Sequence, residues 1–470
     1  MTTTLKPGAP TEMIESPAPA AAPPPLPPMT TRRVLTLALP IIGENLLQTT
    51  VGVVDTLMVA SLGSAAVAGV GTGIEVVFFL IATLSAVGIG ATVLVSQAIG
   101  AGDAERANRL ARQSVVWGVL LAVPVSIAGY LGAEHAIALF GTAPDVAAAG
   151  TTYLRIVAGT SVALLLTFVC GAVLRGAGDS RTPLLASVAA NVVNVGVGYG
   201  LIFGRLGLPE VGLAGVAWGA AAGRATAATL LLTLLIRGRR SVSVRGRAGW
   251  RPHLATARQL VRLGVPAAVE EMMISAGFAT MLAVVAVVGT AALAAQHFAF
   301  TALSLAFLPG FGFGIASTAL VGQSIGARDP AAARTATRIA LRWSMGWMAI
   351  GGVIYLLVAR PAMRLFTDDP AVIEEGVAGL RSLSVGLPFW SLWFVTAGAL
   401  RGSGDTRTPM ITSAGSIWLA VGLAFAAVRW FDGGLGAVWL TFLLTTPLAG
   451  GANWLVLRRR LRTHGGWDRS

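Results

Sequence analysis

The sequence predicts an all-α polytopic membrane protein, with twelve transmembrane helices in two parallel six-helix repeats, an N-lobe and a C-lobe, around a central cleft. Three observations lead to this prediction: an apolar composition, long stretches without Lys or Arg, and motifs that recur at one fixed offset. Of the 470 residues, 55% are hydrophobic and 12% are charged, and the mean hydropathy is +0.74. Because soluble domains carry about 25% charged residues, this composition excludes an ordinary soluble domain.

The basic residues fall at the ends of apolar stretches, which is typical of membrane proteins. Residues 34–105, 113–154 and 263–327 contain no Lys or Arg. At about 20 apolar residues per crossing, the first and third of these stretches hold two helices each. The net charge of +13 therefore does not indicate nucleic-acid binding, which needs basic residues clustered on one face. By the positive-inside rule, the arginine-rich connections and both termini lie in the cytoplasm.

Twelve helices follow from this pattern, with boundaries good to a few residues. They cover residues 34–60, 65–98, 111–132, 151–174, 183–204, 211–236, 259–287, 291–324, 337–358, 377–400, 409–430 and 435–457. Residues 1–32 form a Pro/Ala-rich cytoplasmic tail, which we expect to be disordered because proline at this density favours extended, solvated chain. Residues 237–258 form a basic cytoplasmic linker, and residues 461–470 form a second cytoplasmic tail.

Three motifs recur at an offset of 226 residues, which indicates two copies of one unit. LALPIIGE at 37 returns as LGVPAAVE at 263, LVSQAIGAGD at 94 as LVGQSIGARD at 320, and LRGAGDSRTP at 174 as LRGSGDTRTP at 400. The copies are the N-lobe, 33–236, and the C-lobe, 259–460. Each copy has six crossings, an even number, so both begin on the same side of the membrane and the repeats are parallel. Transporters of this kind bind substrate between their halves and rock the halves alternately.

Acidic residues inside the first predicted helix mark a candidate ion site, because a charge at mid-membrane costs about 2.5–3.5 kcal/mol on insertion scales. Glu44 and Asp55 are eleven positions apart and so differ by only about 20° around the helix axis. With Gln48 they form a polar stripe that we expect to face the cleft. Removal from water favours the neutral form of a carboxylate, which would let Asp55 exchange a proton or Na+. The alternative is a buried carboxylate with a structural role.

The second copy lacks an equivalent of Asp55, because Met281 stands at the matching position. We therefore expect one dominant cation site, in the N-lobe. Glu270 is the repeat equivalent of Glu44, and Glu271 follows it. Glu44 and Glu270 each come four residues after a proline, so they either line the pathway or hydrogen-bond at a proline kink.

A drug pocket should be apolar with a few polar anchors. Aromatic residues in the predicted helices 8 and 10, and methionines in helix 7, are suitable, although packing is the commoner role of such residues. The candidates for the substrate cleft are Gln48, Glu270, Glu271, Met273, Phe307, Trp390 and Trp393.

The repeated decapeptide predicts a structural corner between the fourth and fifth helices of each copy. Its glycines permit a tight turn, its aspartates can accept backbone N–H groups, and its arginines hold the corner on the inner face of the membrane. Any functional role is then limited to contacts that close a cytoplasmic gate. The corner residues are Arg175, Asp179, Arg401 and Asp405.

Motifs of enzymes and of nucleotide binding are absent from the sequence. The only lysine is Lys6, the four histidines lack metal-ligand spacing, and no GxSxG elbow occurs. We therefore expect no enzyme, no cofactor, no structural metal and no nucleotide or nucleic-acid partner, and we expect energy from an ion gradient or from the substrate's own gradient. The expected partners are the lipid bilayer and small organic substrates. We expect the protein to be a monomer. One lysine among 34 basic residues indicates a GC-rich bacterial genome, and hence a bacterial plasma membrane.

The doubled unit resembles the multidrug and toxic compound extrusion (MATE) family. The resemblance rests on Gln-x-Ile-Gly-Ala at 97–101 and 323–327 and on Arg-Gly-x-Gly-Asp-x-Arg-Thr-Pro after the predicted helices 4 and 10, and it covers about residues 33–460. The segment NLLQTTVGVVDTLMVASLG at 45–63 resembles the first helix of the DinF-like branch. The resemblance implies export of drugs or other organic compounds, driven by inward flow of H+ or Na+.

The resemblance also implies a cation-binding aspartate at the position of Asp55. Asn191 and Asn194 match asparagines of the family's helix 5, but Gly198 stands where relatives often carry an Asp or Asn. A site with two carboxylates is thus in doubt, and proton coupling is favoured over Na+. Asn194 or Tyr199 would assist Asp55 instead, and the cation-coupling candidates are Asp55, Asn194 and Glu44.

Two other functional hypotheses compete with that of an antiporter. A lipid-linked glycan flippase of the same superfamily would need Arg or Lys in the cleft to bind pyrophosphate, and the central helices offer mainly Arg224. A membrane scaffold that transports nothing would have no use for the acidic stripe. Glu75 and Arg224 are further intramembrane charges with a possible place on the pathway.

Overall fold

The structure, a computed structural model, describes residues 27–238, 242–246 and 249–462, and every regular element in these ranges is an α-helix. Parts of the predicted tails and linker lie outside the described residues, namely 1–26, for which disorder was predicted, 239–241, 247–248 and 463–470. The N-lobe contains α1 (Thr31–Ala60), α2 (Ser64–Gly100), α3 (Ala104–Ala138), α4 (Pro144–Gly159), α5 (Ser161–Gly176), α6 (Arg181–Phe203) and α7 (Leu213–Arg237). The C-lobe contains α8 (Leu254–Val288), α9 (Thr290–Gly326), α10 (Pro330–Arg364), α11 (Pro370–Gly402), α12 (Arg407–Phe431) and α13 (Leu435–Arg460).

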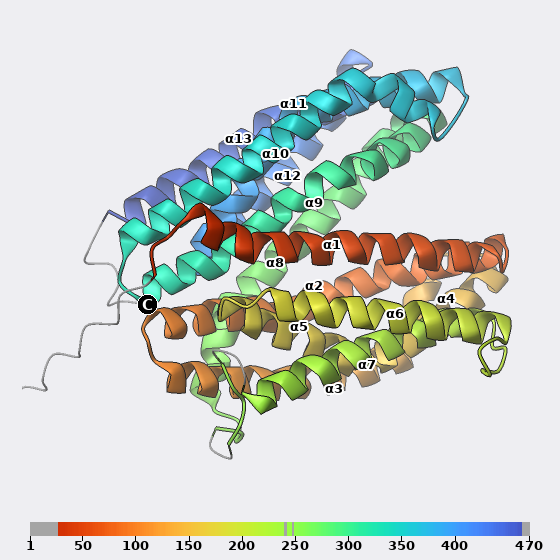
Figure 1. Cartoon of the computed structure of the whole chain (residues 1–470). Helices are drawn as coiled ribbons and strands as arrows, with labels where there is room; N and C mark the ends of the chain where they lie inside the picture. The colour runs from red at the N-terminus through yellow and green to blue at the C-terminus, as the bar shows by residue number, and fades with distance from the viewer. Residues whose placement is uncertain (1–26, 239–241, 247–248, 463–470) are drawn as a thin grey trace, which may run out of the picture.

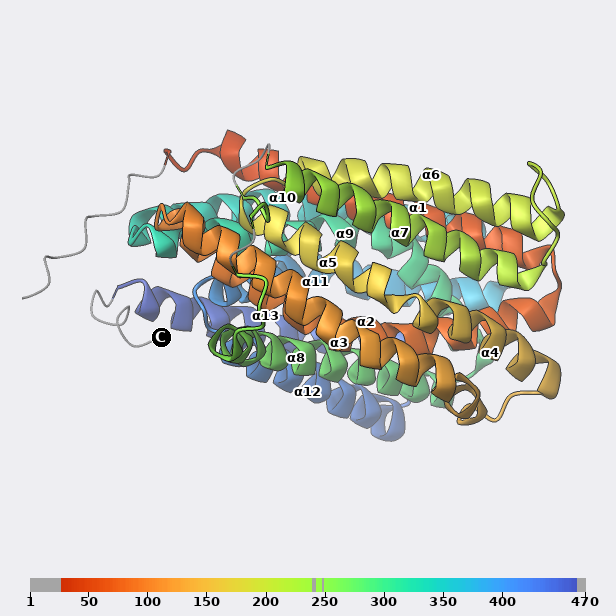
Figure 2. The same ribbon diagram turned by 90° about the horizontal axis from the view of Figure 1, so that it is seen from below.

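The two lobes form a V in Figure 1, and Figure 2 shows the same helices from below. They meet at the end of the molecule where α1 begins and α13 ends, and they diverge towards the other end (Figure 1). We call the first of these the basic end, because the connections there carry the arginine clusters of the sequence. The helices alternate in direction, so that α2, α5, α9 and α11 all finish at the basic end.

The predicted number of crossings is confirmed. Among the described residues, eleven helices are long and apolar enough to span a membrane, and α4 and α5 together make a twelfth crossing that is bent by 51°. The prediction of one unbroken helix over 151–174 was wrong. At the break, Ser126 Oγ of α3 donates to the carbonyl oxygens of Ala158 (2.9 Å) and Gly159 (2.6 Å). These bonds satisfy backbone groups that the bend leaves free.

Several helices extend beyond their predicted ends, because aspartate caps start them before the apolar stretch begins. The third and ninth predicted helices, 111–132 and 337–358, are Ala104–Ala138 and Pro330–Arg364 in the structure. Asp103 accepts from the backbone N–H of Arg106 (2.8 Å), and Asp329 accepts from those of Ala331 and Ala332. Such side chains satisfy the free donors of a helix N-terminus.

The first helix of each copy packs against both lobes. Early residues of α1, such as Val34 and Ile41, share a core with Phe313 and Leu320 of α9, whereas Met58 belongs to an N-lobe core. In the same way, Leu260 near the start of α8 belongs to an N-lobe core, and the later Met281 belongs to the C-lobe core. The repeat-related helices α1 and α8 therefore join the lobes at the basic end.

Candidate functional site

Asp55 lies on α1 near the end that faces away from the basic end, and it is partly buried. Asn194 of α6, which is 7% exposed, donates its Nδ2 group to both carboxylate oxygens of Asp55, at 3.3 and 3.1 Å. The second predicted helper, Tyr199, lies elsewhere: its hydroxyl accepts from Arg205 (3.1 Å). An amide that binds a carboxylate orients it without cancelling its charge.

Two further groups of the N-lobe act on this carboxylate. Arg224 of α7 and Tyr153 of α4 interact electrostatically with Asp55 and with each other. Gly198, one turn beyond Asn194, packs near Met58 and the backbone of α7 and contributes no ligand. Among the described residues, the site thus combines the Asp55 carboxylate and the Asn194 amide with the Arg224 guanidinium and the Tyr153 hydroxyl within electrostatic range.

Two of the other predicted carboxylates, Glu44 and Glu270, are paired with arginines, and the two pairs are related by the repeat. Glu44 of α1 binds Arg175 of α5 at 3.1 Å, and Glu270 of α8 binds Arg401 of α11 at 2.7 Å. Both residues of the second pair are 226 positions beyond those of the first. Side-chain exposure is 14% for Glu44 and 1% for Glu270. The glutamate of the C-lobe pair is therefore the more deeply buried of the two.

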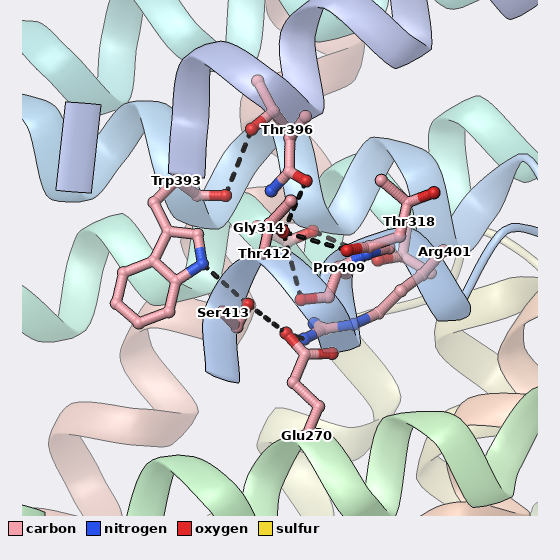
Figure 3. Close-up of polar contacts among 11 residues, drawn as sticks. Glu270, Gly314, Thr318, Trp393, Thr396, Arg401, Pro409, Thr412 and Ser413 are labelled. Atoms are coloured by element: carbon pink, nitrogen blue, oxygen red, sulfur yellow. Dashed lines mark hydrogen bonds and ion pairs between the residues drawn. The ribbon is translucent and has the colours of Figure 1, made fainter. Parts of the chain in front are cut away.

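A hydrogen-bonded chain holds Glu270 in the C-lobe. Trp393 Nε1 donates to Ser413 Oγ (2.8 Å), and Ser413 in turn donates to Glu270 Oε1 (2.6 Å). Figure 3 shows Ser413 of α12 between Trp393 and Glu270, with the Arg401 guanidinium approaching the same carboxylate. Nearby, Thr412 donates to Asn453 of α13 (2.7 Å). This carboxylate is therefore fixed and neutralised by its surroundings.

The decapeptide corners have the same geometry in both copies. Asp179 accepts from the backbone N–H (3.0 Å) and the hydroxyl (2.6 Å) of Thr182, and Asp405 accepts from the same groups of Thr408 at 3.0 and 2.7 Å. Arg460 at the end of α13 also binds Asp405 (3.1 Å). Each turn contains a glycine at positive φ, namely Gly178 (φ 90°) and Gly404 (φ 85°), where a side chain would be strained.

The structure separates the candidates for the substrate cleft into two groups. Trp390 and Trp393 are 3% and 2% exposed and lie in the C-lobe core, where Phe307 packs edge-on against Trp390 with ring centroids 5.1 Å apart. Gln48, Glu271 and Met273 are exposed. The second group can therefore contact a ligand or lipid directly, whereas the two tryptophans are covered by neighbouring side chains.

Sequence reasoning missed the two Glu–Arg pairs, because it assigned Arg175 and Arg401 to the corner alone. A signal was present: the offset of 226 relates both the glutamates and the arginines. It also missed the proximity of Arg224 and Tyr153 to Asp55, for which the sequence holds no local signal.

Comparison with known proteins gives the family. The MatE family model matches residues 40–200 and 266–426, two segments that are again 226 residues apart and together cover well over half of the chain. The chain belongs to the MATE family. The family prediction is thereby confirmed, and with it the assignment as a transporter and not an enzyme.

Bacterial MATE proteins are similar over nearly the whole chain. The chain is 31% identical over 411 residues to the probable multidrug resistance protein NorM of Thermotoga maritima, over 87% of this chain and 88% of that protein. It is 32% identical over 440 residues to the multidrug resistance protein NorM of Burkholderia vietnamiensis, over 91% and 93%. The DinF-like branch stays a prediction.

The fold also matches a solved MATE structure. A multidrug resistance MATE transporter of the MOP superfamily in an outward-facing conformation superposes with a TM-score of 0.86 at 21% identity, over 93% of this chain and 96% of that chain. This match confirms the predicted two-lobed MATE architecture of twelve crossings.

Proposed function

We propose that this MATE protein exports organic compounds by antiport with H+ or Na+, and that Asp55 binds the coupling ion. The observation that supports this role is a difference among the intramembrane carboxylates. Glu44 and Glu270 are each neutralised by an arginine at 3.1 and 2.7 Å, whereas the hydrogen-bond donor to Asp55 is an amide. A carboxylate that keeps its charge can take up a proton or a cation, and one locked to an arginine cannot readily do so.

The relatives support small organic substrates, because two similar proteins are named multidrug resistance proteins. Gln48, Glu271 and Met273 are exposed and combine polar anchors with an adaptable thioether. We assign them to the substrate surface, with the buried aromatic cluster around Trp390 as its rigid support.

The positive-inside rule places the basic end in the cytoplasm, together with both termini, in the plasma membrane of a bacterium. The lobes meet at this end, so the conformation is outward-facing in our proposal. Substrate enters when the basic end opens, and rocking of the lobes then exposes it to the outside. Ion binding at Asp55 in the outward-facing state favours substrate release. The transporter works as a monomer in this scheme.

Efflux from proteoliposomes tests the proposal. With ethidium inside the vesicles, we expect the wild-type chain to export the dye when a pH or Na+ gradient is imposed, and Asp55→Asn to fall to the rate of empty liposomes. Asp145→Asn is the matched control, because Asp145 is an exposed residue in the first turn of α4. Full gradient-driven efflux by Asp55→Asn would refute the role of Asp55. Lipid scrambling without efflux would instead support a flippase.

A further inference from the structure

Glycine packing fixes the level of Arg224 on α7 relative to Asn194 of α6, the residue that binds Asp55. A Cβ atom added at Gly223 would lie only 3.0 Å from the Cβ atom of Asn194, so α7 approaches α6 closely at this point. Arg224 follows Gly223 directly, and its carbonyl oxygen accepts from Thr167 Oγ1 of α5 (3.2 Å). The guanidinium side chain therefore starts at the level of the amide that binds Asp55.

The Arg224 charge acts on Asp55 across a gap. The two residues interact electrostatically, yet no ion pair within 4.0 Å joins them in the part of the chain that the structure describes. The Nη1 group of Arg224 is buried and has no hydrogen-bond partner among the described residues. Tyr153 of α4 is the other titratable group that interacts with both. The site thus holds a permanent positive charge within electrostatic range of Asp55.

We infer that Arg224 makes the N-lobe site selective for H+ over Na+, an inference that rests on the proposed role of Asp55. Hard metal cations need several oxygen ligands at once. Besides the Tyr153 hydroxyl, the side chains that act on Asp55 are the Asn194 amide, which turns its nitrogen to the carboxylate, and the Arg224 guanidinium, which has only donors. Position 198, one turn beyond Asn194, is glycine. A proton needs one covalent bond to one carboxylate oxygen. Arg224 repels a proton and Na+ alike, but a poorly coordinated Na+ has little binding free energy to offset this repulsion, whereas a proton gains a covalent O–H bond.

The same arrangement links proton binding to substrate release. When Asp55 is ionised, its charge offsets that of Arg224. When a proton binds to a carboxylate oxygen of Asp55, the Arg224 charge is left uncompensated inside the N-lobe. A positively charged substrate is then repelled, because charges interact strongly where water is scarce.

Removing the charge of Arg224 tests the inference in ethidium-loaded proteoliposomes. We expect the wild type to respond to a pH gradient and not to a Na+ gradient. Arg224→Gln should gain a response to Na+, and its efflux should have a pH midpoint shifted upward, because a carboxylate without a neighbouring cation holds its proton to higher pH. Arg224→Lys keeps the charge and should keep the wild-type ion preference. Arg155→Gln is the matched control, because the Arg155 side chain is 43% exposed and pairs with Glu134 (3.1 Å).

A folded Arg224→Gln that keeps the wild-type pH midpoint and shows no Na+ response would overturn the inference, as would a wild type driven by Na+. If Arg224→Gln does not fold, carbodiimide labelling of Asp55 in the wild type tests the ion preference instead. The Asp55 label is identified as the labelling that is lost in Asp55→Asn. Acid pH should promote this labelling, and excess Na+ should leave it unchanged. Protection by Na+ would overturn the inference. A wild type without efflux under either gradient contradicts the proposed function itself.

A second, independent observation concerns the repeated Gln-x-Ile-Gly motif at the basic end. Gln97 of α2 donates to the carbonyl oxygen of Gly402 at the end of α11 (3.1 Å). Gln323 of α9 donates to the carbonyl oxygen of Gly176 at the end of α5 (3.0 Å). Both the donors and the acceptors are 226 residues apart. Each glutamine therefore joins its own lobe to the decapeptide corner of the other lobe.

The glycines of this motif bring the two lobes into backbone contact. A Cβ atom added at Gly100 would lie 2.6 Å from the carbonyl carbon of Gln323, and one added at Gly326 would lie 2.7 Å from that of Gln97. Only glycine permits such an approach. Arg33 adds an asymmetric contact, because its Nη2 group donates to Gln323 Oε1 (3.0 Å).

We propose that Gln97 and Gln323 form a reciprocal latch that keeps the basic end closed, and that both break when this end opens. Spin labels at the exposed Arg106 and Arg334, in a Cys170→Ala background, report the distance between the lobes there. Gln97→Ala and Gln323→Ala should each shift the distance distribution to longer values. The double variant should shift it most, and Gln323→Ala should exceed Gln97→Ala because it also loses the contact with Arg33.

Gln113→Ala is the matched control for the latch. This glutamine also donates to two carbonyl oxygens, those of Gly249 and Arg251, but these lie in the segment between the lobes and not across the interface of the latch. It should leave the distance distribution unchanged. An unchanged distribution in the folded double variant would overturn the latch. If that variant does not fold, the two Gln→Asn variants, which shorten the side chain and keep its polarity, should give the same shift, and their failure to do so would overturn it as well.

Discussion

The two lobes are copies of one unit, yet they treat their carboxylates differently. In both copies an acid that follows a proline pairs with an arginine of the decapeptide: Glu44 with Arg175, and Glu270 with Arg401. Beyond this shared pair, the N-lobe has Asp55 bound to Asn194, whereas the C-lobe has Met281 and Ala420 at the matching positions, both fully buried. This difference supports our proposal that the ion pair belongs to the scaffold and that the ion site lies in one lobe.

The packing of the lobes follows the same division. In the C-lobe, the rings of Trp390 and Trp439 pack against Phe442 with centroids 5.1 and 5.3 Å away and fill the interior. In the N-lobe, small residues such as Gly219 and Gly223 let α7 approach α6. An interior packed with rings has little room for a charge that must change state. The glycine-lined side of the N-lobe can accept one polar cluster.

Among the variants that test this difference between the lobes, the largest expected effect is the loss of stability when the arginine of a Glu–Arg pair is removed. Arg401→Met would leave Glu270 buried and unpaired, which costs about 3–5 kcal/mol of unfolding free energy for a buried pair. Arg175→Met should cost clearly less, because Glu44 is 14% exposed against 1% for Glu270. Thermal unfolding of the two variants in detergent measures the difference. Equal losses would contradict the view that the C-lobe copy is the more structural one.

The next largest effect is expected when the Asp55–Asn194 pair of the N-lobe is introduced at the matching positions of the C-lobe. Met281→Asp places a carboxyl in the apolar C-lobe core opposite Ala420, and a buried polar group without a partner costs about 3 kcal/mol. Adding Ala420→Asn recreates the N-lobe pair and should recover part of the unfolding free energy. Met281→Leu is the control and should be close to wild type. No recovery in the double variant would mean that the two lobes place these positions differently.

A smaller effect is expected from the partner of Asp55. A hydrogen bond to a charged group contributes about 1.5–3 kcal/mol. Asn194→Ala should therefore destabilise the ionised form of the Asp55 carboxylate, relative to its protonated form, by that free energy. The pH midpoint of efflux should then move upward by about 1–2 units, since one unit corresponds to about 1.4 kcal/mol. Asn191→Ala, one turn away on α6, is the control. A downward shift, or none, would show that the amide does not hold the ionised carboxylate.

The smallest effect is expected from an ion pair outside both clusters. Glu105 and Arg109 pair across one turn at the exposed start of α3. Exposed pairs of this kind contribute about 0.3–0.5 kcal/mol, so Glu105→Gln should scarcely change thermal unfolding or efflux. A loss comparable to that of Arg401→Met would indicate that the difference between the lobes is not one of burial.

Hydropathy and repetition made the architecture predictable. The number of crossings, the two copies and the positions of Asp55 and Glu270 in their helices all follow from local composition and one offset. The break between α4 and α5 did not follow, because no proline marks it and the serine that stabilises it, Ser126, comes from another helix.

The partners of the carboxylates were harder to predict, because they depend on which helices pack together. Sequence spacing placed Asn194 as a helper of Asp55 through the family pattern, but it gave no sign that Arg224 and Tyr153 lie within electrostatic range. The surroundings of Trp393 could not be predicted from the sequence either. Its aromatic ring suited a ligand surface equally well, and only the packing of α11 against α12 reveals that it donates to Ser413 inside the core.

The central claim is that coupling takes place in one lobe, at Asp55, and proton release on substrate binding tests it most directly. When ethidium is added to the purified protein in weakly buffered detergent solution, competition between drug and proton should release protons into the medium. We predict this release from the wild type and from Glu270→Gln, and none from Asp55→Asn. Release that persists in Asp55→Asn and disappears in Glu270→Gln would place coupling in the C-lobe and contradict the asymmetry described here.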